Sequence, residues 1–80
     1  MEVRWDKEAD AAYISLIPSK DRTVGMAYTS VPLDAEALDP DVPALNSLIL
    51  DFDRDGRLIG IEVLGHPEAV LRDATLGRAS

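Results

Sequence analysis

Apolar and polar residues alternate most regularly along the stretch Asn46–Leu64, NSLILDFDRDGRLIGIEVL. Alternation at a period of two is typical of a strand with one buried face, and an Asp-Gly pair between two such runs is a strong hairpin signal. We therefore predict two antiparallel strands joined by a two-residue type I′ turn at Asp55 and Gly56, with positive φ at both residues. The rest of the chain is expected to be organised around this hairpin.

The position of the turn determines which residues of the two strands face each other. Counting outward places Phe52 opposite Ile59 and Asp51 opposite Gly60, and opposed residues share a face of the sheet. One face then carries Leu48, Leu50, Phe52, Ile59, Ile61 and Val63. The other face carries Ile49, Asp51, Gly60 and Glu62. A three-residue turn would shift the pairing by one and mix these sets, so the pattern favours the two-residue turn. Gly60 leaves space for a neighbouring side chain to pack against its backbone.

The same stretch also matches a calcium-loop pattern. The spacing D-x-D-x-D-G-x-x-x-x-x-E of an EF-hand is met by Asp51, Asp53, Asp55, Gly56 and Glu62. An EF-hand needs a helix on each side of the loop, whereas Pro40 and Pro43 interrupt the upstream segment and both flanks alternate at a period of two. We favour the hairpin, keep these four carboxylates as candidate metal ligands, and expect no heat of binding with millimolar calcium.

Shorter alternating runs predict three further strands. Glu2–Trp5 and Ala11–Ile17 are expected to form a first hairpin, and Thr23–Val31 a third strand. Pro18 ends the second run because proline cannot donate a hydrogen bond to a neighbouring strand. In the first turn, Asp6 is placed to accept hydrogen bonds from nearby backbone N–H groups.

Two segments outside the strands differ in composition from the rest. The stretch from 32 to 45 is rich in proline and carboxylates and is predicted to be an exposed acidic loop. Within it, Asp34–Leu38 can form one helical turn, which Asp39-Pro40 ends. Near the C-terminus, Pro67 suits a first helical position and Gly77 a stop, so a short helix is expected at about 67–76.

These elements predict one domain over residues 1–80, of the α+β class and mainly β. We expect a small antiparallel sheet of about five strands with a short C-terminal helix. A chain of 80 residues buries only about 60% of its unfolded surface. Because Tyr13, Ile17 and Ile49 fall outside the first apolar face, we predict a homodimer that buries the second face or pairs edge strands.

The charge balance narrows the range of partners. The chain has 15 acidic and 8 basic residues, a formal net charge of −7. The basic residues are scattered, which disfavours nucleic acid and anionic membranes; the acidity either serves solubility or attracts a basic protein partner. There is no cysteine, no apolar run approaching the roughly 20 residues that span a bilayer, and no signal-peptide pattern. We therefore expect a cytoplasmic protein without a cofactor.

Carboxylates are the candidate catalytic groups. Asp6, Asp10 and Glu62 are retained because paired carboxylates can act as acid and base when burial raises the pKa of one of them. Capping of turns is the more frequent use of such residues, and Glu62 can instead pair with Arg4 or with an arginine of a partner. His66, the only histidine, precedes a helix start, where capping or exposure is expected rather than metal ligation.

Two motifs, WDKEADAAYISL near the start and LDFDRDGRLIGIEVL in the hairpin, stand in a fixed order along the chain. The first consists of Trp5, Asp6, Glu8, Ala9, Asp10, Ala11, Tyr13 and Ile14. The second consists of Asp51, Asp53, Gly56, Gly60, Ile61, Glu62, Val63 and Leu64. Together they resemble the DUF2283 family of small bacterial and archaeal proteins. The acidic insert between Val31 and Asn46 and the C-terminal extension depart from the usual pattern. The resemblance implies no established activity; some members look like small partners of toxin-like proteins, which implies an antitoxin role as one option.

Three function hypotheses follow, and the sequence alone does not choose among them. The leading one is a non-enzymatic protein-interaction module, antitoxin-like and homo-oligomeric. The second is a small hydrolase or isomerase that uses Asp6, Asp10 or Glu62, which requires a pocket holding at least two of them. The third is calcium binding through residues 51–62.

Overall fold

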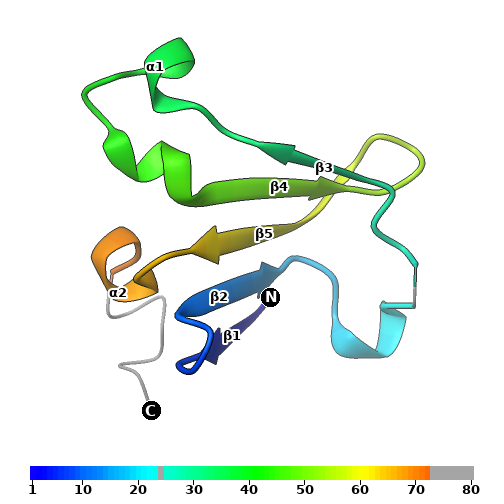
Figure 1. The fold of residues 1–80 in the computed structure, drawn as a ribbon. Helices are drawn as coiled ribbons and strands as arrows, with labels where there is room; N and C mark the ends of the chain where they lie inside the picture. Colours follow the sequence, from blue (N-terminus) through cyan, green and yellow to red (C-terminus); the bar gives the residue numbers. More distant parts are fainter. Residues whose placement is uncertain (24, 73–80) are drawn as a thin grey trace.

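The computed structural model describes residues 1–23 and 25–72. Five strands form one antiparallel sheet in the order β1-β2-β5-β4-β3 (Figure 1). The strands are β1 (Glu2–Asp6), β2 (Ala11–Ser15), β3 (Thr29–Pro32), β4 (Leu48–Phe52) and β5 (Leu58–Leu64). The helices are η1 (Ser19–Asp21), α1 (Ala35–Leu38), η2 (Pro43–Ser47) and α2 (Pro67–Val70). The predicted fold class, a mainly β chain with a five-stranded antiparallel sheet and a short C-terminal helix, is confirmed. None of the helices in the described ranges has the length and apolar character needed to cross a membrane.

β5 lies in the middle of the sheet and joins the two hairpins. It pairs with β4, its neighbour in sequence, and on its other side with β2, so that Ile61 lies opposite both Leu50 and Ile14. The predicted pairing of the central hairpin is confirmed from Leu48–Val63 to Asp51–Gly60. The period-two alternation of this stretch therefore sets the two faces of the sheet as the sequence indicated.

The turn of the central hairpin differs from the prediction. Gly56 has a φ of +80°, but Asp55 does not lie in the positive-φ region, so the turn is not type I′. The Gly56 N–H instead donates to the Asp53 carbonyl at 3.0 Å, and the Asp53 N–H donates to the Arg57 carbonyl at 2.9 Å. A three-residue loop of this kind combines a type I turn with a residue in the left-handed region. The Asp53 carboxylate favours it, because its Oδ1 accepts the N–H groups of Asp55 and Arg57, both at 2.9 Å.

A β-bulge absorbs the additional loop residue. Phe52 pairs with Leu58 rather than with Ile59 as predicted, and the register shifts between Asp51 and Phe52. A bulge sets two residues of one strand against one of the other, so the pairing beyond it returns to the expected register. The apolar residues of the two strands therefore lie on the predicted face of the sheet, although the predicted turn type was wrong.

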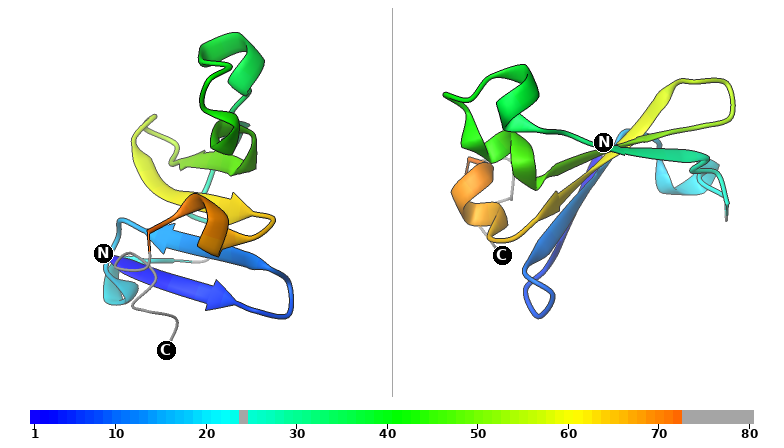
Figure 2. Two further views of the ribbon diagram at one scale, coloured as in Figure 1. Left: turned by 90° about the vertical axis from the view of Figure 1, so that its left-hand side faces the viewer. Right: turned by 45° about the horizontal axis from the view of Figure 1, so that its top comes forward.

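The apolar face of the sheet carries the core. Ala12, Ile14 and Val63 are buried at its centre. The partly buried side chains packed around them are Val3, Trp5, Leu48, Ile61, Val70 and Leu71. Val70 and Leu71 come from α2 and the residue after it, and Figure 2 shows α2 and η2 at the same end of the sheet, where both contact β5. Among the described residues, α2 and Leu71 therefore cover this face at one end.

Three predicted segments have different bounds in the structure. β2 ends at Ser15 rather than Ile17. The third strand occupies Thr29–Pro32 rather than Thr23–Val31, because the predicted segment begins with a turn in which the Met26 N–H donates to the Thr23 carbonyl at 3.2 Å and Gly25 has a φ of +79°. α2 ends at Val70, since Leu71 is already extended, and residues 73–76 of the predicted helix lie outside the described residues. The single helical turn expected in the acidic loop is present as α1.

Candidate functional site

The polar face of the sheet holds a cluster of hydrogen-bonded side chains, which we call the Asp51 cluster: Tyr13, Ser15, Arg22, Ser30 and Asp51. Its centre is the carboxylate of Asp51 on β4, a residue that is only 8% exposed. The Tyr13 hydroxyl from β2 donates to Oδ2 at 3.0 Å, and the Ser30 hydroxyl from β3 donates to Oδ1 at 2.7 Å. Each carboxylate oxygen thus has one hydroxyl donor, as a buried carboxylate requires.

Arg22 supplies the positive charge of the cluster without touching Asp51. Its Nη2 donates to the Tyr13 hydroxyl oxygen at 2.9 Å, and its guanidinium lies over the Tyr13 ring, 5.0 Å from the centroid. Its Nη1 donates to the Ser15 hydroxyl at 3.3 Å, and that hydroxyl donates to the Ile17 carbonyl at 2.9 Å. The Tyr13 hydroxyl therefore relays hydrogen bonding from the guanidinium to the carboxylate.

Gly60 makes this arrangement possible. It lies on β5 between Ser15 of β2 and Asp51 of β4, directly beneath the Tyr13 side chain. A Cβ at position 60 would overlap the hydroxyl and the ring of Tyr13, and would also lie 2.9 Å from its Cε2. The expectation that Gly60 leaves room for a neighbouring side chain is confirmed, and the side chain is Tyr13.

The surroundings of Tyr13 keep its hydroxyl protonated. Burial raises the pKa of Tyr13 above its ordinary value of 10.0, the hydrogen bond and negative charge of Asp51 raise it further, and Arg22 opposes both. A phenol with a raised pKa is a hydrogen-bond donor at neutral pH rather than a nucleophile or a base. The cluster is therefore suited to tying β2, β3 and β4 together across β5.

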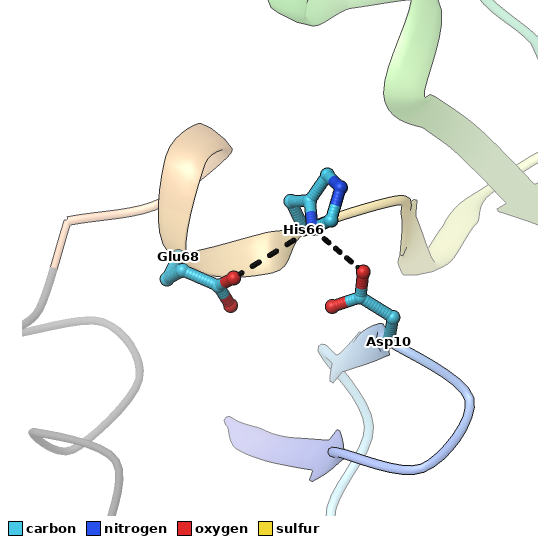
Figure 3. Close-up of polar contacts among 3 residues, drawn as sticks. All are labelled: Asp10, His66 and Glu68. Carbon is cyan, nitrogen blue, oxygen red and sulfur yellow. Dashed lines mark ion pairs between the residues drawn. The ribbon is translucent and has the colours of Figure 1, made fainter.

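A second polar group lies at the opposite end of β2 (Figure 3). His66 Nδ1 is 2.7 Å from Asp10 Oδ2 and 3.8 Å from Glu68 Oε1, and the three ligand atoms lie within 4.8 Å of one another. Asp10 and His66 have φ of 54° and 61°, the two positive values among the described non-glycine residues. The His66 side chain is 73% exposed, so a divalent ion held there would keep much of its hydration shell. His66 makes no side-chain cap to α2 and contacts the first hairpin turn instead.

The three catalytic candidates have different local surroundings in the structure. Asp6 accepts the N–H groups of Glu8 and Ala9 at 3.1 Å each and so caps the first turn, as its position in the sequence suggested. Asp10 pairs with His66, and Glu62 lies mid-strand opposite Tyr13. Tyr13 separates Glu62 from Arg4 in the same row of the sheet, and these two residues form no ion pair. Within residues 1–23 and 25–72, these candidates do not gather around a common point.

The four candidate calcium ligands are likewise apart. Asp51 is held by Tyr13 and Ser30, while Asp53 is held by the turn. In the part of the chain that the structure describes, they form no group of three converging oxygens, and strands rather than helices flank the loop. The geometry favours the hairpin interpretation of this stretch over a calcium loop.

Comparison with known proteins identifies the family. The DUF2283 profile, described as a protein of unknown function, matches residues 2–65. The chain belongs to the DUF2283 family. No curated protein and no solved structure matches it. The resemblance seen in the two motifs is thereby confirmed, and it extends through the acidic insert.

Several residues of the DUF2283 motifs have a structural use in this chain. Tyr13, Asp51 and Gly60, which contributed to the resemblance, form the centre of the Asp51 cluster, while Asp53 and Gly56 build the turn. Arg22 and Ser30 were not singled out from the sequence. No local pattern marks them, because the sheet order brings Ser30 to Asp51, and Arg22 reaches Tyr13 from the segment after η1.

Proposed function

We propose that this DUF2283 protein is a non-enzymatic interaction module that acts as a homodimer and binds a basic protein through its acidic surface. An antitoxin-like role, in which that partner is a toxin-like protein, is the specific form of this proposal.

The partial burial of the apolar sheet face, as seen in residues 1–23 and 25–72, carries the proposal. In the described residues, the buried hydrophobic side chains are Ala12, Ile14, Ala35, Ile59 and Val63. Val3, Trp5, Leu48 and Ile61 belong to the same apolar face but remain only partly buried. Apolar area removed from water stabilises an assembly by roughly 25 cal/mol per Å². A second copy that adds apolar neighbours to this face would enlarge a core that one chain leaves small.

The hydrogen bonds that several carboxylates accept also support a non-enzymatic role. Asp51 accepts two hydroxyl hydrogen bonds, Asp6 caps one turn, and Asp53 caps another. Each of these groups therefore has a structural partner, which is the more frequent use of buried and turn carboxylates.

The acidic insert supplies the surface for a basic partner. α1 and η2 make it an ordered segment, because Asp34 caps α1 and the Asn46 side chain accepts the Ala35 N–H at 2.8 Å. Leu38 and Val42 are 61% and 42% exposed there. The exposed carboxylates around them are Glu36, Asp39 and Asp41. Apolar side chains rimmed by carboxylates suit a partner surface that combines apolar contacts with arginine.

Two experiments test the two parts of the proposal. Light scattering at tens of micromolar should give twice the chain mass of 8.7 kDa, and a monomer would refute the homodimer. Affinity capture from the native host should recover a basic protein at low salt and lose it at high salt. A Glu36→Gln/Asp41→Asn bait should weaken capture, whereas a matched Glu8→Gln/Asp55→Asn bait should not. Recovery of the bait alone would count against the basic partner.

A further inference from the structure

We infer that two copies of the chain associate through the outer edges of their β1 strands, paired antiparallel about Val3. The inference rests on the homodimer proposed above and specifies its interface. The pairing would extend the five-stranded sheet into a continuous ten-stranded one across a two-fold axis.

The hydrogen bonds of β2 determine which groups β1 presents outward. The Leu16 N–H donates to the Ile59 carbonyl at 3.0 Å, which continues the β2–β5 register and directs alternate peptide groups of β2 towards β5. The peptide groups of Tyr13 therefore face β1 and bond its register partner Arg4. By the same alternation, the N–H and C=O groups of Val3 and Trp5 point away from the sheet.

The opposite edge of the sheet is less suited to strand addition. The Leu33 N–H donates to the Leu48 carbonyl at 3.0 Å, so Val31 bonds β4 while Ser30 and Pro32 face outward. Proline has no N–H, and a proline at an outward position is a common protection of an edge strand. Ser30 is thus the single outward N–H donor of β3, and β1 is the better edge for pairing.

Charge complementarity and the bounds of β1 together favour one register. Pairing centred on Val3 sets Glu2 of each copy opposite Arg4 of the other, which gives two favourable pairs on the polar face. Pairing centred on Arg4 would oppose the two arginines and set Glu2 against Asp6. Pairing centred on Trp5 would also set Arg4 opposite Asp6, but the Asp6 carboxylate already accepts two N–H groups of the first turn. It would in addition set the apolar Val3 against Lys7, which lies in the turn beyond β1.

The apolar face is complementary in the same register. Val3 lies opposite Val3, and Met1 opposite Trp5, so the partly buried Val3 and Trp5 gain apolar neighbours. Met1, which is 80% exposed in one chain, becomes covered. Both faces of the sheet therefore favour the pairing centred on Val3.

Reversal of charge tests the register directly. In the dimer, Glu2→Arg replaces both Glu2–Arg4 pairs with pairs of arginines, and Arg4→Glu replaces both with pairs of glutamates. Each variant should therefore raise the dissociation constant of the dimer by about tenfold. The double variant Glu2→Arg/Arg4→Glu restores opposite charges and should return the dissociation constant to within about threefold of wild type. Sedimentation equilibrium gives the dissociation constants. Circular dichroism verifies that each variant is folded. Glu36→Arg and Arg57→Glu, with the same charge changes at exposed sites away from β1, should leave the dissociation constant unchanged.

The outcomes separate this inference from the proposed function. A wild-type monomer across the concentration range refutes the homodimer itself. A wild-type dimer that is indifferent to both single reversals leaves the homodimer standing and overturns the β1 interface. A dimer weakened by Arg4→Glu and restored by Asp6→Arg, but not by Glu2→Arg, overturns the register centred on Val3.

Discussion

Replacing Gly60 with alanine tests the packing of Tyr13 against the backbone of β5. The backbone at position 60 is not in the positive-φ region, so alanine fits the main chain. At such a site the smaller unfolded-state entropy of alanine normally stabilises a protein by about 0.4–1 kcal/mol. Here the added Cβ would overlap the Tyr13 side chain, and because of that overlap we expect Gly60→Ala to lower the stability rather than raise it.

Two responses are open to Tyr13, and both cost more than alanine gains. If the ring stays in place, overpacking costs about 1–3 kcal/mol. If it moves away, the hydrogen bond to the Asp51 carboxylate, which is 8% exposed, is lost at a cost of about 1.5–3 kcal/mol. After the gain is subtracted, Gly60→Ala should destabilise the protein by about 1–2 kcal/mol, a readily measured part of the roughly 4–12 kcal/mol expected for this size.

A double-mutant cycle with Tyr13→Ala isolates this effect. Without the ring there is no overlap, so Gly60→Ala should stabilise the Tyr13→Ala protein by about 0.4–1 kcal/mol, a reversal of sign. Urea unfolding followed by the fluorescence of Trp5, the single tryptophan, gives the four free energies of unfolding. All four proteins are compared at one concentration, since dimerisation would contribute to stability. A Gly60→Ala protein as stable as wild type, or equally destabilised in both backgrounds, would refute the proposed packing.

Three further predictions concern Tyr13 and the hairpin turn. In a Tyr28→Phe variant, ultraviolet titration should give a Tyr13 pKa above its ordinary value of 10.0. Because the folded-state pKa is raised, the contribution of Tyr13 to the free energy of unfolding is fully present below about pH 10 and is lost as the pH rises through the folded pKa. The Tyr13→Phe variant should not show this loss. Gly56→Ala should lower the free energy of unfolding by about 1 kcal/mol, since φ is +80° at that position, and an unchanged urea midpoint would contradict this. Calorimetry with millimolar calcium should give no heat of binding, because the Asp53 carboxylate accepts two turn N–H groups; micromolar affinity would contradict the hairpin interpretation.

Local patterns predicted most of the sheet. The alternation in Leu48–Asp51 and Gly60–Val63 gave the observed register, and Asp6 caps the turn expected of it. Asp39 ends α1 at the position that the following proline indicated. Each of these features depends on neighbours within a few residues. At that range, side chains alternate between the two faces of a strand, and single residue types favour particular turns.

Local patterns failed where two turns compete within a few residues. The Asp55-Gly56 pair favours a type I′ turn, but the Asp53 carboxylate accepts two backbone N–H groups and stabilises a three-residue loop. The bulge next to Phe52 then restores the register that the apolar face requires. The Asp53 side chain therefore decided the turn type, and packing of the apolar face decided the register.

The sequence by itself determined the number of strands, the faces of the central hairpin and the family, because period-two alternation acts locally. Only the tertiary structure decided the Asp51 cluster, since the Tyr13 hydroxyl reaches Asp51 across β5 and Arg22 joins them from a loop. The strand order β1-β2-β5-β4-β3 also brought His66 to Asp10. These contacts join residues far apart in the chain, and no short pattern encodes which strands become neighbours.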